Sequence, residues 1–169
     1  MNATTSSIGD SRLATRLARE LQGEVLFDAF SRGRYSTDAS IYQLEPVGVV
    51  VPRTVDDIRA AMQIAVEEGV PLLPRGGGTS QCGQTVGEAL VMDCSKYLAR
   101  LLAVDTDNCT ATVEPGLVLD DLNRQLKKHG LFYPVDVSTG NRATLGGMAG
   151  NNSCGARSIR YGNMVDNVR

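Results

Sequence analysis

The chain has 169 residues, of which 42% are hydrophobic and 21% charged, and its formal net charge at pH 7 is -2. This composition is typical of a globular protein, and the length suffices for one domain or for two small lobes that share a cleft. The charge balance argues against a general nucleic-acid binder, and no apolar run approaches the roughly 20 residues that a membrane span needs.

The four cysteines, Cys82, Cys94, Cys109 and Cys154, stand too far apart for a CxxC pair or a zinc ribbon. We interpret them as reduced thiols and expect no metal site. The segment from Met1 to Asp10 is small and polar and lacks the basic-then-apolar pattern of a signal peptide. These features favour a cytoplasmic protein with a frayed beginning.

The first predicted helix covers residues 11–22 and ends before Gly23. Residues 27–42 are polar and lack a steady period, so an ordered loop is expected there. The apolar run 47–51 predicts a short buried strand that ends at Pro52. The predicted helix over residues 11–22 has one apolar face, because its leucines recur every four residues, at Leu13, Leu17 and Leu21.

A second helix is predicted from Thr54, a natural N-cap, to Gly69, where a glycine ends it. The next apolar run, residues 70–73, predicts a strand that leads directly into three glycines. Strand, helix and strand in this order predict a βαβ unit, whose ligand sites lie beyond the carboxyl ends of its strands. The glycines therefore stand where this fold binds ligands.

Three further elements follow. Residues 89–93 predict a third strand, and residues 101–105 with 110–114 predict a hairpin across Asp105 to Asn108. A helix is expected over residues 118–128 with Gly130 after its end. The chain from Pro134 to Gly162 is rich in Gly, Asn, Ser and Thr, which fits either disorder or a close-packed backbone at a ligand.

The loop after residue 75 has the composition of a phosphate-binding turn. Three consecutive glycines permit positive φ or close approach, and their N–H groups can converge on one anion. No lysine stands where a Walker A loop requires it, and the chain after Gly78 leads to another strand instead of the helix of a dinucleotide fingerprint. We interpret residues 76–80 as a pyrophosphate loop and residues 144–155 as a second wall of the same site.

Five motifs occur in an order that resembles a known family, the FAD-linked oxidoreductases of the vanillyl-alcohol oxidase and p-cresol methylhydroxylase type. The similarity is greatest to the branch of D-lactate, glycolate and D-2-hydroxyglutarate dehydrogenases and covers about residues 32–169. The motifs are Tyr35-Ser36-Thr37-Asp38-Ala39-Ser40, Pro74-Arg75-Gly76-Gly77-Gly78-Thr79-Ser80, Val113-Glu114-Pro115-Gly116, Leu145-Gly146-Gly147-Met148 and the segment from Ser153 to Gly162.

The resemblance implies an α+β fold, the two-lobed FAD-binding domain of the p-cresol methylhydroxylase type, incomplete at the C-terminus. Residues 1–31 would be a leader and helix, residues 32–116 the first lobe with the pyrophosphate loop, and residues 117–169 the start of the second lobe. FAD would be held non-covalently, because Thr79 stands where related oxidases with covalent FAD often have histidine. An iron–sulfur cluster is implied only for a region after residue 169.

The resemblance also assigns cofactor-binding positions. Those near the pyrophosphate are Arg75, Gly76, Gly77, Gly78, Thr79, Ser80, Gly83 and Gln84. Those along the flavin and ribityl portion are Pro134, Thr144, Gly146, Gly147, Asn152, Ser153, Gly155, Tyr161 and Gly162.

No catalytic residue is named. The single histidine, His129, closes a helix, where a capping or surface role is favoured over a general base. For Cys154, a small buried thiol is favoured over an approach to the flavin, and Asp38 is interpreted as structural. For Arg157 and Arg160, a contact to cofactor phosphate or acidic substrate and a solvated or structural role stay equally open.

The expected function is the FAD-binding portion of a dehydrogenase that passes a hydride from a D-2-hydroxy acid to FAD and then to an electron acceptor. The chain alone is expected to be inactive. The alternatives are a non-catalytic nucleotide-binding module and an NAD-dependent enzyme with a helix directly after Gly78. The expected location is cytoplasmic, with a peripheral position at the inner membrane left open.

Overall fold

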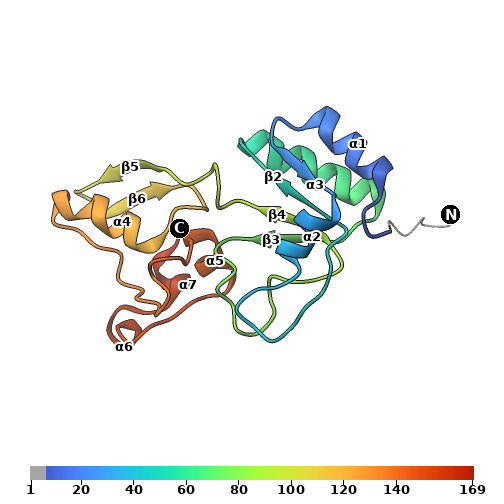
Figure 1. Ribbon diagram of the computed structural model, residues 1–169. Helices are drawn as coiled ribbons and strands as arrows, with labels where there is room; N and C mark the ends of the chain where they lie inside the picture. The colour runs from blue at the N-terminus through green and yellow to red at the C-terminus, as the bar shows by residue number, and fades with distance from the viewer. Residues whose placement is uncertain (1–6) are drawn as a thin grey trace. The chain divides into compact units, whose positions relative to one another are not determined.

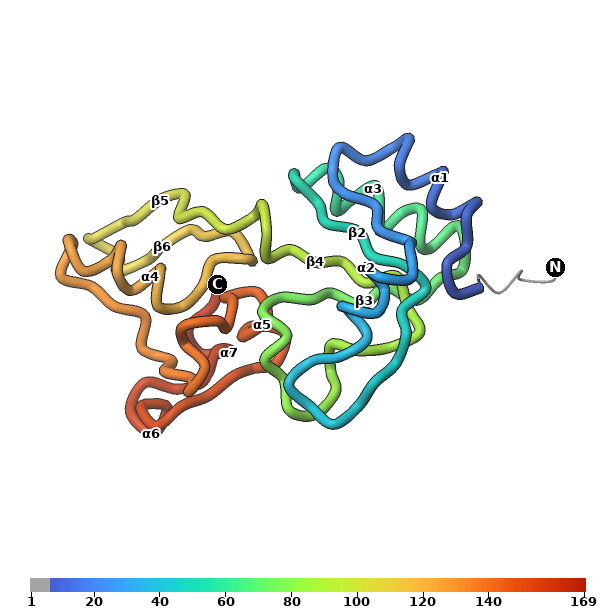
Figure 2. Tube along the Cα trace, viewed as in Figure 1, coloured from blue at the N-terminus to red at the C-terminus, as the bar shows by residue number. Residues whose placement is uncertain are grey.

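The computed structural model describes residues 7–169, which form two compact units, one ending at Tyr97 and one beginning at Leu98 (Figures 1 and 2). Each unit has its own hydrophobic core. Among the described residues, no helix is both long and apolar enough to cross a membrane.

The first unit is built on a four-stranded sheet with strand order β1-β2-β4-β3. Strand β1 is antiparallel to β2, whereas β2, β4 and β3 are parallel to one another. Because parallel strands end at the same edge, the segments after β2, β3 and β4 all leave from one side of the sheet. The strand bounds are Glu24–Leu26 for β1, Gly48–Val51 for β2, Leu72–Arg75 for β3 and Leu90–Asp93 for β4.

Helices cover both faces of this sheet. On one face, α1 (Ser11–Glu20) and α3 (Val55–Glu68) pack their leucine and isoleucine side chains onto β2 and β4. On the other face, valines of β2 and β4 contact Tyr35 at the end of α2 (Ala29–Tyr35). Burial on both faces explains why β2 and β4 are continuous apolar runs without alternation.

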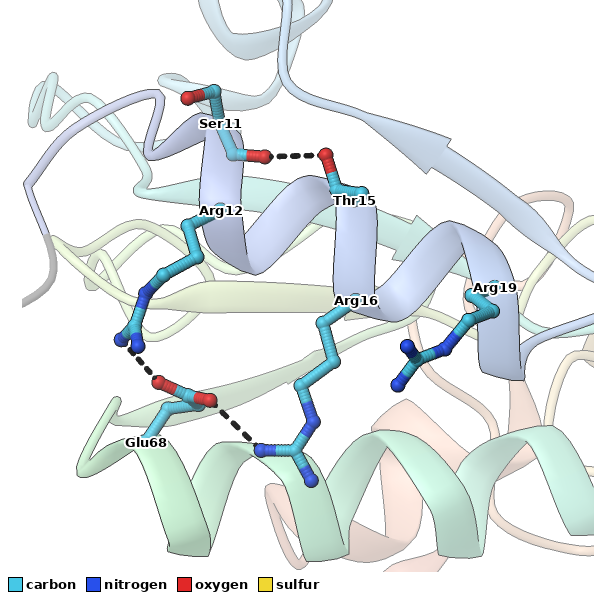
Figure 3. Close-up of a pocket in the computed structure, with 6 residues that line it drawn as sticks. All are labelled: Ser11, Arg12, Thr15, Arg16, Arg19 and Glu68. Carbon is cyan, nitrogen blue, oxygen red and sulfur yellow. Dashed lines mark hydrogen bonds and ion pairs between the residues drawn. The ribbon is translucent and has the colours of Figure 1, made fainter.

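Ion pairs join α1 to α3 along their solvent side (Figure 3). Arg12 and Arg16 of α1 both point toward Glu68 of α3, with N–O distances of 2.6 and 2.8 Å, and Arg16 also pairs with Glu67. The basic groups are therefore balanced by acidic partners. The leucine face of α1 and this row of pairs hold the helix against α3 from two sides.

Residues 29–35 of the predicted loop form α2, and residues 24–26, just before that loop, form β1. Helix α2 begins where the Asp28 carboxylate accepts a hydrogen bond from the Ser31 N–H at 2.9 Å. It has seven residues, includes Gly33 and leaves Phe30 exposed, so it shows no apolar period. Strand β1 has three residues and is a strand because it pairs with β2. The local sequence does not reveal this pairing.

The second unit contains the hairpin of β5 (Leu101–Asp105) and β6 (Thr110–Val113), helix α4 (Leu119–Leu126) and three short helices. A 3-10 turn over Lys127–His129 follows α4, and Gly130 closes it in the left-handed conformation. The short helices are α5 (Leu145–Gly150), α6 (Ser158–Tyr161) and α7 (Met164–Asn167). The core of the second unit includes Leu119, Leu122, Leu126, Val135, Leu145, Met148 and Met164.

The predicted strands and long helices are found with boundaries shifted by no more than two residues, and the predicted hairpin is present. The hairpin belongs to the second unit because Leu101, Val104 and Val113 pack onto that unit's core. The units therefore divide between residues 97 and 98, whereas the resemblance places the lobe boundary after residue 116. The predicted βαβ strands β2 and β3 are parallel, but β4 lies between them.

Candidate functional site

The glycine loop leaves the carboxyl end of β3 and continues without a helix to residue 89. Gly78 and Gly83 have φ of +62° and +74°, a region that L side chains rarely adopt. A Cβ atom on Gly83 would lie 2.6 Å from the ring of Tyr42. Both glycines are thus required by the local backbone, and the absence of a helix after Gly78 excludes the dinucleotide fingerprint geometry.

The backbone N–H groups of this loop are open. Within residues 7–169, the N–H groups from Gly76 to Gln81 donate to no backbone or side-chain acceptor. Consecutive free N–H groups around a glycine of positive φ form the concave arrangement that binds phosphate oxygens. Close by, the Ser80 hydroxyl contacts the Gln84 side chain and accepts the Cys82 N–H at 3.2 Å.

A neighbouring segment, residues 36–44, supports the glycine loop (Figure 2). The Ala39 N–H donates to the Gly78 carbonyl oxygen at 3.1 Å. The Asp38 carboxylate accepts hydrogen bonds from the Ser40 N–H at 2.8 Å and from the Thr85 hydroxyl at 2.9 Å. Sequence reasoning interpreted Asp38 as structural but missed its partner Thr85, which is 47 residues away.

Arg75, a predicted cofactor-binding residue, has its guanidinium engaged by backbone. One terminal nitrogen donates to the Thr37 carbonyl at 2.8 Å, and the other donates to the carbonyls of Tyr35 and Thr85, both at 3.2 Å. These partners lie 10 to 40 residues from Arg75 in the chain. The arginine therefore joins three segments of the first unit.

The second glycine-rich segment is ordered and close-packed within the second unit. The Gly146 N–H donates to the Pro115 carbonyl at 2.8 Å, and a Cβ atom on Gly146 would lie 2.6 Å from the Pro115 side chain. A Cβ atom on Gly155 would lie 2.0 Å from the Asp136 carbonyl oxygen. Here the glycines permit close approach of one backbone to another, as the small and apolar pattern indicates.

The other predicted residues of this segment also make internal contacts. Buried Thr144 caps α5 by accepting the Gly147 N–H at 3.3 Å. Asn152, with φ of +45°, accepts the Val165 N–H at 3.0 Å, and Ser153 bridges α5 to α7 through backbone hydrogen bonds. Gly162 has φ of +80°, and the Tyr161 ring meets Phe132 edge to face. The structure thus gathers residues 144–162 around α5, next to the irregular segment that contains Pro134.

Other candidate residues have ordinary places. His129 is exposed in the 3-10 turn after α4, as the surface interpretation has it. Arg157 pairs with Asp136 and lies over the Phe132 ring. Burial, with the negative charge of Asp93, raises the pKa of the Cys94 thiol to about 11, so it stays protonated. In the described part of the chain, no group of three His, Cys, Asp or Glu gathers in a way that could hold a metal ion.

Comparison with known proteins adds a family. Residues 46–169 match the family described as "FAD binding domain". The chain is 38% identical over 159 residues to D-2-hydroxyglutarate dehydrogenase of Pantoea ananatis, covering 92% of this chain and 16% of that protein. It is 39% identical over 153 residues to glycolate oxidase subunit GlcD of Bacillus subtilis, covering 88% of this chain and 33% of that protein.

Solved structures show the same fold. Alkyldihydroxyacetonephosphate synthase matches with a TM-score of 0.82 at 22% identity, over 92% of this chain and 31% of that chain. p-Cresol methylhydroxylase matches with a TM-score of 0.70 at 16% identity, over 89% of this chain and 31% of that chain. This chain therefore has the fold of the p-cresol methylhydroxylase type and spans a third or less of these relatives' length.

Proposed function

Because residues 46–169 match the FAD binding domain over most of the chain, the chain belongs to that family, and we propose that it holds FAD in a dehydrogenase of D-2-hydroxy acids. The relatives named above are a D-2-hydroxyglutarate dehydrogenase and a glycolate oxidase subunit. Their substrates suggest a small 2-hydroxy acid for the enzyme of which this domain is part.

The observation that carries the proposal is the run of open N–H groups from Gly76 to Gln81 beyond β3. A hydrogen bond to a charged acceptor contributes about 1.5 to 3 kcal/mol, so several of them together favour a pyrophosphate strongly. Unpaired backbone groups are costly unless solvent or a ligand satisfies them. A pyrophosphate at this loop supplies acceptors for these donors.

The residues present fit FAD in the following roles. The loop residues from Gly76 to Ser80, with Gly83 and Gln84, bind the pyrophosphate. When bound, FAD accepts the hydride; the protein supplies binding and orientation. Thr79 carries a hydroxyl and no imidazole, so FAD is held non-covalently. Along the flavin and ribityl portion we propose contacts from Pro134, Thr144, Gly146, Gly147, Asn152, Ser153, Gly155, Tyr161 and Gly162.

The electron acceptor and the location belong to the same proposal. Reduced FAD must pass its electrons to an acceptor, which requires a carrier or a further redox group in the whole enzyme. The location proposed is cytoplasmic, with a peripheral position at the inner membrane as the alternative.

Substitution of Gly78 tests the loop directly. Gly78→Ala places a Cβ at φ of +62° and 2.8 Å from the Arg75 guanidinium, so it should raise the Kd for FAD by about tenfold or more. Gly69→Ala is the matched control, because Gly69 has φ of +65° but no neighbouring atom within 4 Å of the added Cβ. It introduces the same backbone strain at the end of α3 and should leave the Kd unchanged.

The measurement is a titration of the apoprotein with FAD, followed by flavin fluorescence. Equal affinities of Gly78→Ala and wild type would contradict the pyrophosphate loop, and a wild type that does not bind FAD would contradict the whole proposal. Anaerobic addition of D-2-hydroxyglutarate, D-lactate or glycolate then reports on turnover. We expect no bleaching of the flavin by the 169-residue chain, which spans 16 to 33% of the relatives named above.

A further inference from the structure

Arg75 is placed behind the glycine loop by three hydrogen bonds that it donates to backbone carbonyls. Its partners are the carbonyl oxygens of Tyr35 at 3.2 Å, Thr37 at 2.8 Å and Thr85 at 3.2 Å. The planar guanidinium has five N–H donors in a fixed fork, which suits several acceptors held at set positions. One side chain therefore fixes the start of the 36–44 segment and the far end of the glycine loop together.

The arginine is itself held by a network that reaches the sheet. Its guanidinium carbon lies 5.2 Å from the centre of the Tyr35 ring, close enough for a cation–π interaction. The Tyr35 hydroxyl donates to the carboxylate of buried Asp93, the last residue of β4, at 2.7 Å. Burial, together with the hydrogen bond to Asp93, raises the pKa of Tyr35 well above its usual range, so the hydroxyl stays a donor.

The loop contacts this arrangement at Gly78. The Gly78 carbonyl accepts the Ala39 N–H at 3.1 Å, and Arg75 binds the carbonyl of Thr37, two residues before Ala39. A Cβ on Gly78 would lie 2.8 Å from a terminal nitrogen of Arg75, so the loop backbone passes directly over the guanidinium. The carbonyl of Gly78 is thus satisfied by the support, while the N–H groups from Gly76 to Gln81 stay open for an anion.

We propose that Arg75 is a positioning residue: it fixes the glycine loop in the conformation that binds the pyrophosphate and does not itself contact the phosphates. This inference rests on the proposed binding of FAD. The proposed role requires the fork of N–H donors of a guanidinium, and a positive charge alone is not sufficient for it. Lysine, a point charge with three donors on a flexible stem, does not reproduce the fork.

The variants Arg75→Lys and Arg75→Met separate the two roles. If Arg75 positions the loop, both variants should raise the Kd for FAD by about tenfold, since both leave backbone carbonyls of the support without partners. The dependence of the Kd on salt should stay that of wild type, because the number of charged groups at the phosphates is unchanged. A direct phosphate contact instead predicts that lysine largely preserves affinity and that methionine weakens the salt dependence.

Arg53→Lys is the matched control. Arg53 follows β2 at the same edge of the sheet, and its guanidinium lies 4.2 Å from the Tyr97 ring centre and donates to the Tyr97 hydroxyl at 3.1 Å. It thus shares the stacked arginine–tyrosine arrangement with Arg75 but makes no hydrogen bond to the glycine loop within residues 7–169. The affinity of the Arg53→Lys variant for FAD should equal that of wild type.

Amide hydrogen exchange of the FAD-free protein tests the positioning independently of the cofactor. Exchange of the Ala39 N–H should be about tenfold faster in Arg75→Lys, whereas the Cys94 N–H, which donates to the backbone carbonyl of Arg75, should exchange at the wild-type rate. Unchanged exchange at Ala39 overturns the proposal, as does equal acceleration at both amides, which marks general destabilisation. A wild-type protein that does not bind FAD would instead count against the proposed function alone.

Discussion

Asp38 shows how a single carboxylate organises the support of the glycine loop. One of its oxygens accepts the Ser40 N–H at 2.8 Å and the other accepts the Thr85 hydroxyl at 2.9 Å. Burial by itself raises the pKa of Asp38, but the hydrogen bonds from Ser40 and Thr85 outweigh it and hold the pKa below its ordinary value of 3.8. The charged form is therefore the one that the folded protein favours.

The pH dependence of stability follows from this lowered pKa. A carboxylate with a lower pKa in the folded protein stabilises the fold at pH values above 3.8 and loses that effect as the pH falls through its folded pKa. The difference in urea midpoint between wild type and Asp38→Asn should thus be constant from about pH 7 to pH 5 and shrink below about pH 4. A difference that stays constant to pH 3 would show that the charge of Asp38 contributes nothing.

At the scale of elements, the start of α3 is the best-defined junction in the first unit. The Asp57 side chain accepts the N–H groups of Gln22 and Arg53, both at 2.8 Å, and forms a capping box with Thr54. Asp57 is only 3% exposed, so its oxygens are shielded from water. One carboxylate thereby joins the end of α1, the turn after β2 and the first turn of α3.

Removal of this carboxylate should be costly. Asp57→Ala leaves buried N–H donors unpaired and removes half of the capping box, so we expect a loss of about 3 kcal/mol in the free energy of unfolding. Asp56→Ala is the control on the preceding residue. Within residues 7–169, exposed Asp56 makes only a surface pair with Arg59, so this change should cost less than about 0.5 kcal/mol. Urea denaturation measures both, and comparable losses would contradict the structural role of Asp57.

The elements that sequence predicted are those whose signals are local. Helix α3 carries its cap, its apolar period and its closing Gly69 within one stretch, and the hairpin turn is fixed by the Asp105 side chain, which accepts two nearby N–H groups. Helix α2 and strand β1 were missed because the first is short and without a period and the second depends on its partner strand. The insertion of β4 between β2 and β3 is likewise a matter of pairing.

In the candidate site, too, the features with local sequence signals were predicted and those that depend on distant partners were not. The glycine pattern located the loop, because a run of glycines is informative by itself. The partners of Arg75 and Asp38 were not predictable, since Tyr35 and Thr85 reach them across 40 and 47 residues of sequence. In the second unit the glycines were expected near a ligand, and the structure adds that Gly146 and Gly155 first serve the packing of backbone on backbone.

At the scale of the whole molecule, the chain has two units with separate cores, and one ligand, FAD, is proposed to bind residues of both. Leu17 lies in the core of the first unit and Leu122 in that of the second, and both are almost fully buried. A leucine-to-alanine change in such a core costs about 2 to 5 kcal/mol. Each change should act mainly on the unit that contains it when FAD is absent.

FAD should couple these units if residues of both contact it. A ligand at 100 times its Kd stabilises the folded protein against unfolding by about 2.7 kcal/mol, and this effect extends to every segment that must be folded for binding. We therefore expect FAD to slow amide exchange in α1 and in α4 alike, and Leu122→Ala to weaken FAD binding although it lies outside the first unit. Leu17→Ala is the corresponding core change in the first unit, and its effect on FAD binding is compared with that of Leu122→Ala. Slower exchange confined to residues 7–97, with wild-type FAD affinity in Leu122→Ala, would show that the pyrophosphate loop binds the cofactor alone and that residues 144–162 serve only the packing of their own unit.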